Sequence, residues 1–103
     1  IVNHGVIDYA ILKAAIYGSI KEIFTLKKYF DKNKVTMILS SCLQTPIGNM
    51  SSIHVASALQ LKNNHGLNNH VFFDYPINKT LYFKDNESIS LEGVKGLGIA
   101  AND

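Results

Sequence analysis

A lysine and one polar loop are the parts of this sequence best suited to chemistry. Lys13 ends one apolar run, and a second run, residues 35–39, leads into a loop that contains Ser41, Leu43 and Gln44. An ammonium group can oppose negative charge or exchange a proton, and a serine hydroxyl beside free backbone N–H groups can hold a carboxylate. The carboxyl ends of parallel strands are where α/β barrels keep their catalytic residues, so both segments are candidates for one site.

Alternating apolar runs and helical patterns must position these residues. Residues 6–12 and 35–39 are mostly apolar with Asp8 as the only charged residue, which is typical of parallel strands covered on both faces. Between them, Ser19 and Glu22 have the spacing of a capping box, which predicts a helix that begins at Ile20. The first half of the chain therefore reads as strand, helix, strand.

The second half continues the alternation and then changes character. Thr45 and Pro46 supply an N-cap and a proline for a second helix, predicted over residues 46–61. A third short strand is predicted over residues 67–73. Two further short strands, residues 80–83 and 88–91, are expected to flank a turn. The predicted order of the main part is strand, helix, strand, helix, strand.

Composition narrows the class of protein. A chain of 103 residues with 47% hydrophobic content is sufficient for one small domain with a real core. Ten basic residues are scattered among eight acidic ones, which argues against a nucleic-acid partner. The single Cys42 indicates a reducing compartment, and no apolar run approaches the roughly 18 residues of a membrane span. A cytoplasmic protein without a membrane partner is expected.

Four short motifs, in this order, resemble the carboxyl-terminal part of enolase-superfamily enzymes. The motifs are Leu12-Lys13, Ser40-Ser41-Cys42-Leu43-Gln44, Gly66-Leu67 and Gly96-Leu97-Gly98-Ile99. Within the superfamily they are most like the muconate-lactonizing-enzyme branch, and in it the o-succinylbenzoate synthase family of menaquinone biosynthesis. The resemblance implies an α/β fold that supplies about strands six to eight of a TIM-like (β/α)7β barrel. Residues 1–73 would form a βαβαβ barrel segment, and residues 74–103 a tail that packs toward the capping domain.

The resemblance also implies roles for individual residues. Lys13 matches the catalytic acid/base lysine of the family. Ser41 and Leu43 match the loop that holds the substrate carboxylate, and Gln44 and Gly66 complete the implied substrate-binding set. Gln44 departs from the family pattern, which usually has glutamate at that position. The chain also has Ala14 where a proline commonly follows the lysine and Asn68 where an aspartate often follows Gly-Leu.

A Mg²⁺ ion is the implied cofactor, because this family stabilises an enediolate with a metal held by carboxylates. The matching metal ligands would lie upstream of Ile1, so no metal ligand is assigned in this chain. We therefore expect a fragment that is inactive alone and whose partners are the rest of the barrel, the capping domain and a small carboxylate substrate. The parent activity would be a lyase that dehydrates its substrate.

Two alternatives remain open. A dipeptide epimerase or N-acylamino acid racemase of the same superfamily would use the same lysine to move a proton on the α-carbon. In the other alternative the chain is a non-catalytic, truncated α/β module that forms homo-oligomers to cover its strand edges. Substrate loops outside this sequence would decide between the lyase and the epimerase or racemase. The intact mass of the native protein would decide between an enzyme fragment and a non-catalytic module.

Overall fold

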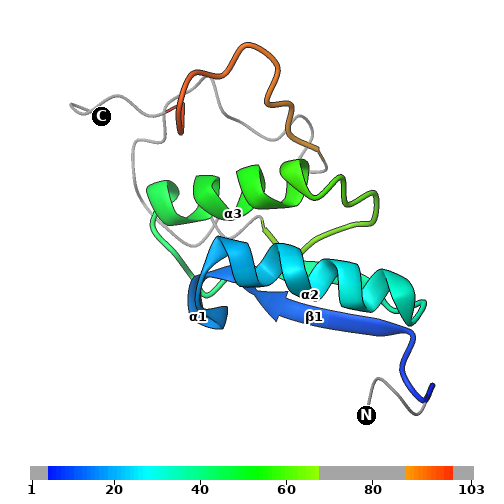
Figure 1. Cartoon of the computed structure of the whole chain (residues 1–103). Helices are drawn as coiled ribbons and strands as arrows, with labels where there is room; N and C mark the ends of the chain where they lie inside the picture. Colours follow the sequence, from blue (N-terminus) through cyan, green and yellow to red (C-terminus); the bar gives the residue numbers. More distant parts are fainter. Residues whose placement is uncertain (1–4, 68–87, 99–103) are drawn as a thin grey trace.

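The computed structural model describes residues 5–67 and 88–98. In these residues the fold is a small mixed α/β domain with a two-stranded parallel sheet (Figure 1). Its elements, in chain order, are β1 (Tyr9–Lys13), α1 (Ala14–Tyr17), α2 (Ile20–Lys32), β2 (Thr36–Ser40) and α3 (Pro46–Ala58). The predicted alternation of strands and helices is confirmed over this part of the chain. The short helix α1 was not predicted.

β1, β2 and the bridged residue Gly66 lie side by side in the same order as in the chain. Lys13, the last residue of β1, lies opposite Ser40, the last residue of β2. A parallel bridge joins Ser40 to Gly66 on the other edge of β2. The chain therefore returns beside β2 after α3, as expected for a third strand. Most of that predicted strand, residues 68–73, lies outside the described residues.

Local signals fix where the two long helices begin. The Glu22 backbone N–H donates to the Ser19 hydroxyl at 3.2 Å, and the Ser19 backbone N–H donates to the Glu22 carboxylate at 2.9 Å. This capping box starts α2 at the predicted residue. Thr45 caps α3 and Pro46 is its first residue, also as predicted. The helix α3 ends at Ala58 rather than at Leu61, because Gln60 adopts a left-handed φ of 53°.

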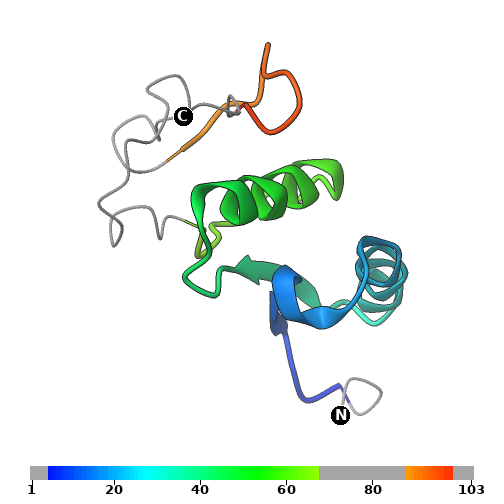
Figure 2. The ribbon, with the colours of Figure 1, turned by 90° about the vertical axis from the view of Figure 1, so that its left-hand side faces the viewer.

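The core closes one face of the sheet. Met37 and Leu39 of β2 are 2% and 0% exposed, and they share a single cluster with Ile23 of α2 and Ile53 of α3. Figure 2 shows β2 with α3 above it and α2 on its right. Because successive strand residues point to opposite faces, Met37 and Leu39 identify the covered face.

The other face of the sheet is open among the described residues. Tyr9 and Ile11 of β1 are 64% and 68% exposed, and Ile38 of β2 is only partly buried. Among the described residues β1 is therefore covered on one face only, because both long helices pack into the same core. The predicted cover of its second face would come from further protein.

The carboxyl-terminal segment reaches the core without forming the predicted strand. Residues 89–91 belong to no strand, contrary to the prediction for residues 88–91, and the predicted strand at residues 80–83 lies outside the described residues. Ile89, Leu91 and Leu97 nevertheless pack against the core cluster. Apart from a single bridge at Ser88, apolar side chains hold the described part of this segment.

Candidate functional site

Two strand ends and one bridged glycine meet at the carboxyl edge of the sheet. Lys13 lies opposite Ser40, and Ser40 is bridged to Gly66. Paired residues of neighbouring parallel strands direct their side chains to the same face, so Lys13 and Ser40 share the open face. The Lys13 side chain is exposed and Ser40 is partly buried. An ammonium group and a hydroxyl are thus neighbours at the edge where the sequence predicted a site.

Ser40, and not Ser41, is the serine in register with Lys13. The Ser41 backbone N–H donates to the Gly66 carbonyl at 2.9 Å, so this amide is already used by the sheet. Sequence reasoning missed Ser40 because it did not assign the alternation of β2. The buried pair Met37 and Leu39 would have supplied that signal, since the residue after Leu39 must point to the opposite face.

Gly66 keeps space beside the Ser40 hydroxyl. A Cβ atom at Gly66 would lie 3.2 Å from Ser40 Oγ and 3.6 Å from Ser40 Cβ. Either the hydroxyl or the strand end would have to move to accommodate a side chain. The absence of a side chain at Gly66 therefore allows the close approach of the chain to β2.

The loop after β2 is fixed to α3 by Gln44. Its amide Nε2 donates to the Gly48 carbonyl at 3.3 Å, and its Oε1 accepts from the Ser52 hydroxyl at 3.2 Å. Leu43 has a φ of 54° and a side chain that is 63% exposed. Gln44 is therefore hydrogen-bonded to α3, whereas the Leu43 side chain is exposed to solvent. Both residues follow β2 at the same end of the sheet as Lys13.

A histidine next to the site was not singled out by the sequence. The Leu39 backbone N–H donates to His65 Nδ1 at 3.1 Å, so the ring takes the position of a strand carbonyl beside β2. This bond requires the neutral ring with its proton on Nε2. Burial lowers the pKa of His65 from its usual value, and a backbone hydrogen bond with Leu61 opposes that change. His65 thus fixes the approach of Gly66 to β2.

The described residues contain no cluster of side chains that could bind a metal ion. Within residues 5–67 and 88–98 no three His, Cys, Asp or Glu side chains gather closely enough to hold an ion. These residues alone therefore do not fit the Mg²⁺ that the family resemblance implies. In the same ranges, none of the helices has the length and apolar character needed to traverse a bilayer.

Comparisons with known proteins do not identify a family for this chain. No protein-family model matches the chain, and neither a curated protein nor a solved structure gives a significant match. The fold and the edge site together define a class only: an α/β domain with a polar site at the carboxyl edge of a parallel sheet.

Proposed function

We propose that this chain supplies the carboxyl-terminal βα units of a Mg²⁺-dependent lyase barrel like o-succinylbenzoate synthase. In this proposal Lys13 is the catalytic acid/base and Ser40 joins Ser41 in binding the substrate carboxylate. The observation that carries the proposal is the register that aligns Lys13, Ser40 and Gly66 along one edge.

The order of the sheet is the one that a β/α barrel requires. In a β/α barrel each strand neighbours the next one in the chain, and all helices lie outside. One βαβαβ half of a doubly wound sheet shares this order and also keeps its helices on one face, so the motifs around Lys13 and Ser40 are what favour the barrel. Here β1, β2 and Gly66 follow chain order, and α2 and α3 join one core on one face.

The open face has the composition expected of a barrel interior. Ile11 and Ile38 lie opposite each other on it, and branched aliphatic side chains dominate the packed layers inside such barrels. Lys13 follows Ile11 on the same face, one layer closer to the carboxyl edge. A substrate above that layer would be within reach of the ammonium group.

The proposed chemistry follows from these groups. Next to a substrate carboxylate and away from bulk water, the Lys13 ammonium group would stabilise negative charge that develops when a proton leaves the adjacent carbon. The neutral amine could itself accept or return a proton. The Ser40 hydroxyl would donate to a carboxylate oxygen. The Mg²⁺ ligands of such an enzyme would come from outside this chain.

Two measurements on the native full-length protein test the proposal. Its intact mass is compared with 11.4 kDa, and its Mg²⁺-dependent dehydration of the o-succinylbenzoate precursor is assayed. Lys13→Ala should lower kcat by about 10²-fold or more, the usual range for a general acid/base. Lys32→Ala is the matched control, because Lys32 is exposed at the last residue of α2, just before the chain enters the amino-terminal end of β2. Near-native turnover in Lys13→Ala would contradict the catalytic assignment.

Kinetics of a second variant separate binding from chemistry. Ser40→Ala should raise KM more than it lowers kcat, since the hydroxyl is assigned to carboxylate binding. An unchanged KM would remove Ser40 from the site. Turnover of a dipeptide or an N-acylamino acid instead of the precursor would redirect the same lysine to the epimerase or racemase reaction.

One observation favours the second candidate, a non-catalytic module. The Ser41 N–H is bonded to Gly66 and both ends of the Gln44 amide are bonded to α3, so these groups already serve the fold. A native mass equal to a multiple of the chain mass, without lyase or epimerase activity, would support this candidate. It would also give the open face of the sheet a second copy of the chain as its cover.

A further inference from the structure

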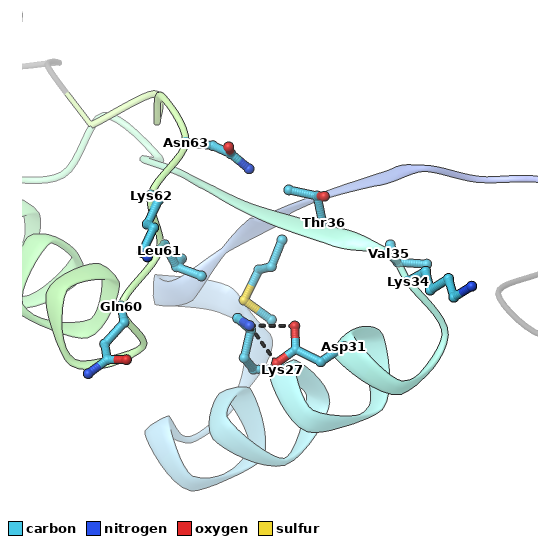
Figure 3. A pocket seen from close by; sticks show the side chains of 10 residues that line it. Lys27, Asp31, Lys34, Val35, Thr36, Gln60, Leu61, Lys62 and Asn63 are labelled. Atoms are coloured by element: carbon cyan, nitrogen blue, oxygen red, sulfur yellow. Dashed lines mark hydrogen bonds and ion pairs between the residues drawn. The ribbon is translucent and has the colours of Figure 1, made fainter.

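The two edges of the parallel sheet differ in what lies beside them. Next to β2, the Ser41 N–H donates to the Gly66 carbonyl at 2.9 Å, and the Gly66 N–H donates to the Leu39 carbonyl at 3.0 Å. Near the start of β2, Thr36 and Asn63 line one cavity of about 310 Å³, where the loop after α3 passes beside the strand (Figure 3). The outer edge of β2 is therefore occupied by this chain.

The outer edge of β1 has no such neighbour among residues 5–67 and 88–98. In these ranges the sheet has two strands, and β1 runs along the lower side of the molecule in Figure 1. The Thr36 N–H donates to the Asp8 carbonyl at 2.8 Å, so Asp8 faces β2. Because the peptide groups of successive strand residues point to opposite edges, those of Tyr9, Ile11 and Lys13 face outward.

The strand β1 also lacks the features that protect a free edge in other proteins, namely prolines, bulges and several charges. It contains no proline, and its register with β2 is unbroken from Tyr9 to Lys13. Its one charged residue is Lys13, at the very end. The side chains of Tyr9 and Ile11 are more than half exposed and extend the apolar surface to this edge. Such an edge is a template for another strand.

A second copy of β1 matches this edge in one antiparallel register. A closed dimer needs a two-fold axis, and antiparallel pairing of the same edge provides one. With the axis at Ile11, the centre of the strand, Ile11 exchanges both hydrogen bonds with the partner's Ile11. The Lys13 N–H donates to the carbonyl of the partner's Tyr9, while the Lys13 carbonyl remains with α1, for which Lys13 is the N-cap. The outward-facing groups of the two copies thus meet one another.

The side chains favour the same register. Tyr9, Ile11 and Lys13 all project on the open face, and Lys13 comes to lie opposite the partner's Tyr9. An ammonium group beside an aromatic ring gains from a cation–π contact. An axis at Lys13 would instead set two ammonium groups opposite each other, and an axis at Tyr9 would leave Lys13 beyond the paired part of β1.

We propose that the outer edge of β1 is a self-association site, at which a second copy of this chain adds its own β1 antiparallel. This inference rests on the second candidate function, the non-catalytic module, and names its interface. A two-fold axis perpendicular to the sheet keeps α2 and α3 of both copies on one face. In the lyase barrel the same edge would take a parallel strand from outside this chain, so the two arrangements exclude each other.

Cross-linking through single cysteines tests the register in the native protein. In a Cys42→Ser background, Ile11→Cys should give a disulfide-linked dimer under mild oxidation. The two copies of this residue would have Cα atoms about 5.5 Å apart, which suits a disulfide. Tyr9→Cys is the matched control, because its two copies would lie roughly 13 Å apart along the strands. No cross-link in Ile11→Cys, or equal cross-linking of both variants, would overturn the inference.

The dissociation constant of the dimer, from light scattering over a range of concentrations, separates the edge from the open face. Ile11→Pro removes an outward N–H without removing a bond to β2, and it should raise Kd about 100-fold. Ile11→Thr keeps the N–H and should raise Kd less than about fivefold. Equal weakening would place the contact on the open face and overturn the inference, while leaving the oligomeric module intact. A monomer with lyase activity would overturn both.

Discussion

The two faces of the parallel sheet are made by the same two strands and differ in what covers them. Met37 and Leu39 are closed in by α2 and α3, while Tyr9 and Ile11 are left mostly exposed. Burial of apolar surface is the main favourable term in folding, at roughly 25 cal/mol per Å². The covered face should therefore carry the stability of the domain, and the open face its capacity to bind further protein beside Lys13.

Truncation of the covered face should have the largest effect. Leu39 has no exposed surface and lies at the centre of the cluster that joins both long helices to β2. Leu39→Ala is expected to lower the free energy of unfolding by about 3 kcal/mol, through lost transfer energy and the cavity that remains. Urea denaturation measures this. A loss below about 1 kcal/mol would show that the core can collapse around the smaller side chain.

Loss of a buried tether should have the next largest effect. Asn49 of α3 is 5% exposed, and its Nδ2 donates to the Leu67 carbonyl at 2.8 Å, which holds the covering helix to the segment beside β2. Asn49→Ala should destabilise the fold by about 1 to 2 kcal/mol by leaving that carbonyl without its partner. Ser51→Ala on the same helix is the control, because its hydroxyl donates to the Ile47 carbonyl one turn earlier. Equal losses in both variants would contradict the role of Asn49.

Acid should weaken the attachment of the segment around Gly66 to β2. Burial lowers the pKa of His65 in the folded state, so the unfolded chain binds the proton more readily. The stability from the neutral ring is complete above the unfolded pKa of about 6.5 and falls as the pH drops toward the lower folded value. Denaturation curves across this range measure the loss. His65→Asn, whose amide oxygen can also accept a backbone N–H, should remove this part of the pH dependence.

The parts predictable from sequence were those encoded by nearby residues. Ser19 and Glu22 specify the start of α2 within one helical turn, and Thr45 and Pro46 do the same for α3. The helix α1 has only four residues, too few to show a periodic pattern, and it was missed. The premature end of α3 depends on the left-handed conformation of Gln60, which has no glycine to signal it.

Residues brought together from distant segments were harder to predict. Lys13 was placed at the carboxyl edge from its strand alone, and the structure agrees with that position. The choice between Ser40 and Ser41 depends on the phase of β2, which a continuously apolar run does not reveal. The cavity lined by the end of α2, the start of β2 and the loop after α3 combines three distant segments, so no single stretch of sequence could have pointed to it.

Truncation of the open face should have the smallest effect on the chain by itself. Ile11 is 68% exposed, so Ile11→Ala should change the free energy of unfolding by less than about 0.5 kcal/mol. The same variant in the native assembly is the more informative measurement. If other protein covers this face, as both candidate functions require, Ile11 becomes a core residue there and its truncation should cost about 2 kcal/mol or more. A small effect in both settings would leave the open face without a partner and weaken the barrel and the oligomer alike.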